Sequence, residues 1–147
     1  MIDWQKLPDE NEYRFIAVLN RKIETGKLMN ALGHMTAGLS GKVGVGQDMC
    51  FLEYRDQDGG IHPGISHFPF IVLAADNSNK IRAVRAEAEK RGITFADFTS
   101  TMTLGTSREQ VEVTAATPEL DLEYYGIVMF GKTSDLREFT GKFSLFR

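Results

Sequence analysis

The chain opens with a strand pattern followed at once by a helix pattern, and this order limits the folds available to it. The run from Tyr13 to Asn20 is rich in aromatic and β-branched residues, which predicts a buried strand. A helix is predicted from Thr25 to about Leu39, because apolar residues recur there at the spacing of one helical face. These residues are Leu28, Leu32, Met35 and Leu39. Gly41 is expected to end this helix.

The same alternation continues to the end of the chain. Further strands are predicted at residues 48–55, 68–74, 93–98, 122–130 and 142–146. Further helices are predicted from a cap at Asp76 or Asn77 to about residue 91 and at residues 135–139, and residues 107–116 form either a helix or an irregular segment. Residues 58–60 form a predicted turn, and a loop is expected over residues 61–67. Strands that alternate with helices predict a three-layer α/β/α sandwich around a mixed sheet, formed by residues 13–147 after an N-terminal arm of residues 1–12.

Charge and cysteine content narrow the function classes. The 147 residues carry a net charge of −3, with a pI of about 5.6, which disfavours a broad basic surface for long nucleic acids. Cys50 is the only cysteine, so an internal disulfide is excluded, and a lone thiol favours a reducing compartment. No signal peptide or membrane span is expected, which predicts a cytoplasmic protein. Cys50 lies within a predicted apolar strand, so we expect a buried, unreactive thiol.

Two motif-like patterns are better explained as ordinary structure. Residues 126–133 match the phosphate-binding consensus GxxxxGK[ST] letter for letter. Their four middle residues are apolar, however, and predict a strand rather than a loop of exposed backbone amides. His62 and His67 lie near two aspartates, but their spacing matches no established zinc motif. The sequence therefore predicts neither a nucleotide cofactor nor a bound metal.

The first helix carries the strongest signal for a functional site. Residues 25–47 contain no Asp or Glu, and Lys27 lies in the first helical turn, where the helix dipole normally favours an acid. Lys27 and His34 share one helical face about 10 Å apart, separated by the small Ala31. Backbone amides, dipole and lysine together predict an anion site. The alternative is a solvated lysine beside a packed histidine.

A family resemblance rests on residues along most of the chain. The strand at residues 13–20, then Gly26, Lys27 and a histidine seven positions later, resembles the opening of type 2 peptidyl-tRNA hydrolases. Asp97 and Thr101 fall on that family's D-A-G-x-T pattern, and residues 140–146 (TGKFSLF) are similar to its terminal segment. The chain lacks the family's glutamine after the Gly-Lys pair, where it has Ala31. It resembles more closely a group of relatives named domain of unknown function 2000.

The resemblance implies an ester hydrolase that acts on peptidyl-tRNA or on a smaller phosphate-bearing ester. Lys27 would hold a phosphate or stabilise an oxyanion, Asp97 would orient or deprotonate water, and Thr101 and His34 would add hydrogen bonds. The implied partner is a small anionic substrate or the 3′ end of a tRNA. The alternative is a non-catalytic module that binds a small anion or a protein through the same cleft.

Two further expectations concern geometry and assembly. Lys27 and Asp97 each follow a predicted strand, and binding crevices of open α/β sheets form beyond the carboxyl ends of strands. We therefore expect the two side chains to meet at one cleft. A second stripe of small residues on the first helix predicts close packing against another chain, and so a homodimer. The stripe consists of Gly26, Asn30, Gly33 and Ala37.

Overall fold

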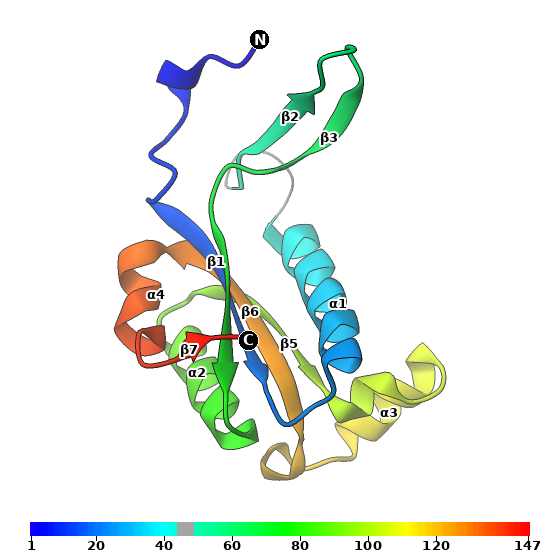
Figure 1. Cartoon of the computed structure of the whole chain (residues 1–147). Coiled ribbons are helices and arrows are strands. Elements are labelled where there is room, and N and C mark those ends of the chain that lie inside the picture. Colours follow the sequence, from blue (N-terminus) through cyan, green and yellow to red (C-terminus); the bar gives the residue numbers. More distant parts are fainter. Residues whose placement is uncertain (44–48) are drawn as a thin grey trace.

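The computed structural model describes residues 1–43 and 49–147 and has a mixed α/β fold (Figure 1). Its main sheet has five strands in the order β5-β6-β1-β4-β7. These strands are β1 (Tyr13–Asn20), β4 (Phe70–Ala75), β5 (Thr94–Thr99), β6 (Tyr124–Lys132) and β7 (Ser144–Leu145). β1 and β4 are parallel, and every other neighbouring pair in this sheet is antiparallel. The predicted mixed sheet is confirmed.

Four α-helices lie within the described residues. They are α1 (Thr25–Val43), α2 (Ser78–Lys90), α3 (Ser107–Ala115) and α4 (Thr133–Thr140). Asn77 caps α2, because its side chain accepts a hydrogen bond from the Lys80 amide at 3.0 Å. α1 continues through Gly41, so the expected helix end at that residue is wrong. A glycine costs an α-helix only about 1 kcal/mol relative to alanine, which does not force the helix to stop.

Alternate residues of β1 divide the core into two clusters. Phe15, Ala17 and Leu19 pack with α1, whereas Ile16 and Val18 pack with α2 and α4. Successive side chains of a strand point to opposite faces of the sheet, so α1 covers one face and α2 and α4 cover the other (Figure 1).

A second, two-stranded sheet is formed by β2 (Phe51–Arg55) and β3 (Ile61–Ser66), which project as a hairpin away from the main sheet (Figure 1). The turn at residues 58–60 is confirmed, but the loop expected over residues 61–67 is instead largely strand. This strand was not predicted because it contains Pro63 and Gly64, and both residue types are rare inside strands. A Cβ at Gly64 would lie 2.0 Å from the Leu52 carbonyl oxygen, so the close approach of β2 requires glycine.

Cys50 lies directly before β2 rather than inside a strand, and its φ of 49° is left-handed. The residue is partly buried against the core cluster of α1, so the expectation of a fully buried thiol within a strand is wrong. The four apolar residues 127–130 of the pattern that mimics a phosphate loop lie in β6, as predicted, and the strand continues to Lys132. Among the described residues, no helix is long and apolar enough to cross a membrane.

Two short 3-10 helices lie next to the strands that form the candidate site. The 3-10 helix η2 (Ser100–Thr103) follows β5 directly, and η3 (Glu119–Asp121) precedes β6. The N-terminal arm is held at its inner end, where the Thr133 hydroxyl donates to the Asn11 carbonyl at 2.6 Å.

Candidate functional site

Lys27 lies in the first turn of α1, beside the end of β5. β5 is antiparallel to β6, and β6 is antiparallel to β1, so β1 and β5 run in the same direction and end at the same edge of the sheet. The start of α1 and the 3-10 helix η2 therefore meet there. Together with the start of β6 they enclose a cleft of about 290 Å³, here called the Lys27 cleft. It is lined by Gly26, Lys27, Asn30, Thr103 and Tyr125.

The polar groups of the Lys27 cleft suit an anion. The Lys27 ammonium, the Asn30 amide and the Tyr125 hydroxyl can all donate hydrogen bonds. The Thr103 hydroxyl donates to the Ser100 carbonyl at 2.6 Å, which fixes the turn of η2. The five described lining residues include one cation and no carboxylate or imidazole. The lining therefore favours binding of a negatively charged group over removal of a proton.

Thr101 does not line the Lys27 cleft and belongs to a chain of buried hydroxyls. Its oxygen lies 2.7 Å from the Thr99 hydroxyl and 2.8 Å from the Thr114 hydroxyl. Thr114 donates its only proton to the Gln110 carbonyl at 2.7 Å, so Thr101 must donate to Thr114 and accept from Thr99. The Thr101 proton is thereby used to connect β5 and η2 with α3.

His34 lies two helical turns after Lys27 and is exposed, on the face that the sequence predicts. Its ring stacks against Phe98 with 6.0 Å between ring centroids and 27° between ring planes. His34 is not among the residues that line the Lys27 cleft.

Asp97 lies on the opposite face of the sheet from Lys27. Along β5, Phe98 packs with the α1 cluster, whereas Phe95 packs with the α2 cluster, and Asp97 shares the parity of Phe95. The Asp97 carboxylate accepts a hydrogen bond from Arg85 of α2 at 2.7 Å. The expectation that Lys27 and Asp97 meet at one cleft is therefore wrong. Both follow strands that end at one edge, but a shift of one residue along a strand moves a side chain to the other face.

The Arg85–Asp97 pair is part of a network that ties α2 to β5, β6 and η3. Arg85 also pairs with Glu89 at 3.2 Å, as the i,i+4 spacing predicts. Burial by itself lowers the pKa of Arg85, but the hydrogen bond and the charge of Asp97 outweigh it and raise the pKa above the ordinary value. The Asp97 side chain is only 16% exposed, and its carboxylate is held in the ion pair with Arg85. In this position it stabilises the contact between α2 and β5 and is not free to act as a base.

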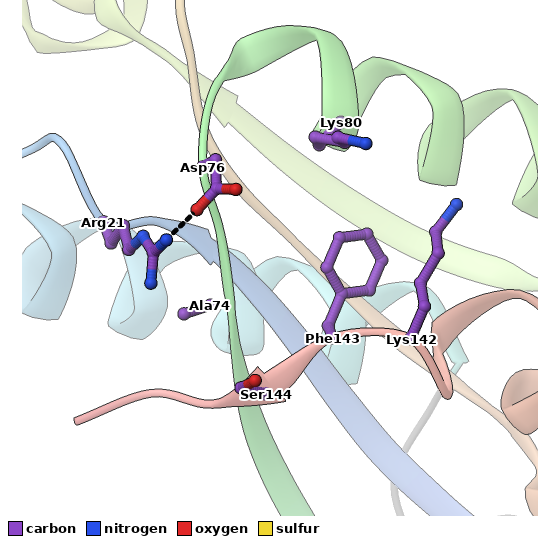
Figure 2. A pocket seen from close by; sticks show the side chains of 7 residues that line it. All are labelled: Arg21, Ala74, Asp76, Lys80, Lys142, Phe143 and Ser144. Carbon is purple, nitrogen blue, oxygen red and sulfur yellow. Dashed lines mark ion pairs between the residues drawn. The ribbon is translucent and has the colours of Figure 1, made fainter.

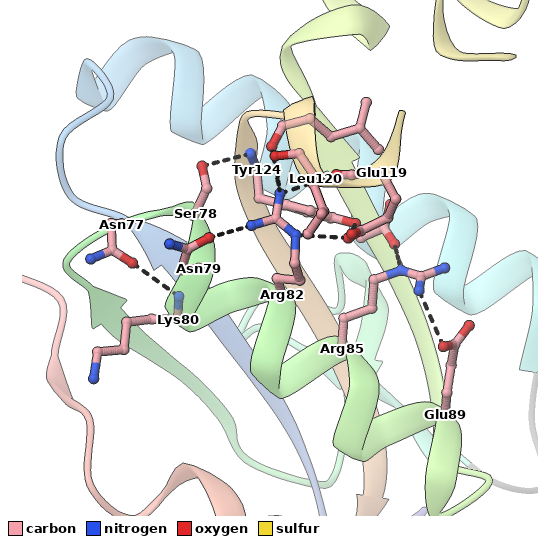
Figure 3. A network of polar contacts seen from close by, with 12 residues as sticks. Asn77, Ser78, Asn79, Lys80, Arg82, Arg85, Glu89, Glu119, Leu120 and Tyr124 are labelled. Atoms are coloured by element: carbon pink, nitrogen blue, oxygen red, sulfur yellow. Dashed lines mark hydrogen bonds and ion pairs between the residues drawn. The ribbon is translucent and has the colours of Figure 1, made fainter. Parts of the chain in front are cut away.

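Arg82 forms the other half of this network (Figure 3). Its guanidinium donates to the Glu119 carboxylate at 2.8 Å and to the carbonyls of Glu119 and Leu122 at 3.1 and 3.0 Å. The Tyr124 hydroxyl donates to the same carboxylate at 3.0 Å. Burial, followed by this hydrogen bond, raises the pKa of Tyr124 to about 12.

Sequence reasoning missed Arg82, Glu119 and Tyr124. The i,i+3 spacing of Arg82 and Arg85 was a signal, because it places both guanidinium groups on one face of α2. Glu119, the partner of Arg82, lies in the short 3-10 helix η3, which has no periodic pattern that could be recognised in the sequence. Within the described part of the chain, no three His, Cys, Asp or Glu side chains are grouped so that they could hold a metal ion.

Comparison with known proteins identifies relatives whose functions are themselves unknown. A search of curated proteins found no match. Among solved structures, the chain is similar to a protein of unknown function from Agrobacterium tumefaciens, with a TM-score of 0.79 and 17% sequence identity. The similarity covers 92% of this chain and 98% of the other, and it shows a shared fold.

A family model described as a protein of unknown function, DUF2000, matches residues 13–147. The resemblance to domain of unknown function 2000 is thus confirmed, and the chain belongs to the DUF2000 family.

Proposed function

We propose that the chain binds a small anion in the Lys27 cleft. The observation that supports this most is the lining itself, in which one lysine is joined by an amide and a tyrosine hydroxyl without any described carboxylate. Phosphate and carboxylate groups accept hydrogen bonds from all three donors. The negative net charge of the chain favours a small ligand over a long nucleic acid. A phosphate-bearing metabolite or the 3′ end of a tRNA has the required chemistry.

Hydrolysis of an ester, such as that of peptidyl-tRNA, is the second candidate. The resemblance of Gly26, Lys27 and His34 to type 2 peptidyl-tRNA hydrolases supports it. The expected mechanism needs Asp97 as a base beside Lys27, whereas Asp97 pairs with Arg85 on the other face of the sheet. Binding without turnover therefore has the stronger support. The superfamily assignment and the α/β/α sandwich stay predictions.

Lys27→Ala is expected to weaken binding of inorganic phosphate about tenfold, which corresponds to about 1.4 kcal/mol. The ammonium supplies the only charge among the described lining residues, so its loss removes the charge-assisted hydrogen bond. The measurement is a phosphate titration followed by NMR at the backbone amides of residues 26–30, 103 and 125. Lys27→Arg should retain most of the affinity.

Lys90→Ala is the matched control, because Lys90 is an exposed lysine in the last turn of α2. Both variants should unfold at the denaturant concentration of the wild type, since neither lysine is buried. Equal phosphate affinity at residues 26–30 in the wild type and in Lys27→Ala would contradict the proposal.

Turnover assays separate the two candidate functions. The wild type and Lys27→Ala are incubated with diacetyl-lysyl-tRNA and with simple esters. Phosphate binding without release of free tRNA or acid supports the binding module. Release that depends on Lys27 would favour the hydrolase, and Asp97→Asn would then test whether the carboxylate takes part.

A homodimer is the assembly that we propose. The small-residue stripe of Gly26, Asn30, Gly33 and Ala37 is exposed along α1. A Cβ at Gly26 or Gly33 would meet no described atom within 4 Å, so this surface leaves room for a close approach. Light scattering at micromolar concentration should give about twice the 16.5 kDa of one chain, and Ala37→Arg should reduce it to one chain. A mass of 16.5 kDa for the unmodified protein would refute the dimer.

A further inference from the structure

A second hollow lies beyond the carboxyl ends of β1 and β4 (Figure 2). These two strands are parallel neighbours, and the helices that follow them, α1 and α2, cover opposite faces of the sheet. The point where the connections diverge to the two faces is where open α/β sheets form crevices that hold ligands. The hollow has a volume of about 270 Å³. It is lined by Arg21, Ala74, Asp76, Lys80, Lys142, Phe143 and Ser144.

The lining has an excess of positive charge. Arg21 forms an ion pair with Asp76, which neutralises both groups and holds the guanidinium at the rim. Lys80 and Lys142 form no ion pair with any residue that the structure describes, and both side chains lie along the same hollow (Figure 2). Two ammonium groups are thus left to face a ligand. A chain with a net charge of −3 does not gather cations by composition alone.

The surface beside this hollow adds to the charge. An adjoining hollow of about 390 Å³ shares Arg21, Ala74 and Ser144 and extends to Arg147. The backbone of α2 contributes less, because the Asn77 side chain already accepts the Lys80 amide proton at 3.0 Å. Recognition of an anion here would rest on side chains that come from three separate elements, the end of β1, α2 and the segment before β7.

Phe143 gives this charged hollow an apolar wall. It is partly buried against the core cluster of α2, and the Lys142 ammonium lies 5.5 Å from the centre of its ring. An aromatic face beside two cations fits a ligand with an apolar or planar body and a charged head. A phosphomonoester carries a charge of about −1.5 to −2 at pH 7, which matches the two unpaired lysines.

We propose that the hollow between β1, α2 and β7 binds a phosphomonoester, with Lys80 and Lys142 on the phosphate and Phe143 beside the organic group. This site is separate from the Lys27 cleft, with which it shares no lining residue. The occupant expected is a small phosphorylated metabolite rather than a nucleic acid strand, because the hollow is small and the chain as a whole carries a net charge of −3.

The test uses phenyl phosphate and inorganic phosphate as probes, titrated into the full-length protein and followed by NMR. Phenyl phosphate should cause saturable shifts at the backbone amides of residues 74–80 and 142–144, and it should bind more tightly than inorganic phosphate. Lys80→Ala and Lys142→Ala should each weaken its binding about five- to tenfold, and the double variant further. Lys90→Ala, on the same helix but outside the hollow, should leave the affinity unchanged.

Folding is checked by the denaturation midpoint, which should not move because both lysines are exposed. Phe143→Leu keeps an apolar side chain in the core and should remove only the preference for phenyl phosphate over inorganic phosphate. Unchanged affinity in the double variant would overturn the proposal. So would shifts that appear only at the Lys27 cleft and vanish in Lys27→Ala, a result that would support the proposed function while refuting this second site.

Discussion

Leu28→Ala is expected to reduce the free energy of unfolding by about 2–5 kcal/mol. Leu28 is 1% exposed and packs in the core cluster between α1 and the sheet. Truncation removes apolar contacts and leaves a cavity that the neighbouring strands can fill only in part. Because Leu28 follows Lys27 directly, the same change should also loosen the start of α1. Equilibrium unfolding in urea, followed by circular dichroism, measures the loss.

Met29→Ala provides the matched control for Leu28→Ala. Leu28 and Met29 are adjacent in α1 and both have large apolar side chains. Met29, however, is 68% exposed. Its truncation should change the unfolding free energy by no more than about 0.5 kcal/mol. Similar losses in the two variants would show that α1 does not pack on the sheet in the orientation described.

The second large effect is expected at alkaline pH and depends on Tyr124. The folded state raises the pKa of this hydroxyl from 10.0 to about 12, first through burial and then through its hydrogen bond to Glu119. Stability from this group is complete below pH 10 and is lost as pH rises towards 12, because the unfolded tyrosine ionises first. For a pKa that rises from 10.0 to about 12, the stability lost between these two pH values is about 2 kcal/mol. The unfolding free energy of the wild type should fall by about this amount between pH 10 and 12.

Tyr124→Phe has no phenol to ionise at this position and should therefore lose about 2 kcal/mol less than the wild type over the same pH interval. Tyr54→Phe is the control, because Tyr54 lies in the hairpin, is 47% exposed and should leave the wild-type pH profile unchanged. Urea unfolding at a series of pH values measures all three proteins. Identical alkaline profiles for the wild type and Tyr124→Phe would rule out the raised pKa.

The sequence predicted regular elements well where apolar periodicity was strong. The strand at Tyr13–Asn20 was placed residue for residue, and the α2 cap and most of the strand predicted at residues 122–130 were also found. The β3 strand was missed because its proline and glycine suggest a loop, and the glycine is explained only by the close approach of Gly64 to the β2 backbone. Local patterns of this kind carry no information about a partner strand.

The candidate site was predictable only in part for a related reason. Periodicity places Lys27 on α1, and strand order brings the ends of β1 and β5 to one edge. The face on which Asp97 points depends on a single residue of register, which a predicted strand boundary does not fix. Two sets of contacts could not be predicted from spacing in the sequence, because each joins residues from separate elements. They are the hydroxyl chain through Thr101 and the hydrogen bonds of Arg82.

The position of β6 in the sheet limits when the sheet can form during synthesis of the chain. This strand comes from the last quarter of the sequence, yet it lies between β1 and β5 and pairs with both along most of its length. During synthesis β1 leaves the ribosome long before β6 exists, so the centre of the sheet cannot close until almost the whole chain has been made. Pairings between distant segments also slow folding, because the chain between them must be ordered before the contacts form. β1 can pair with β4 earlier, but its other edge stays open until β6 has been made.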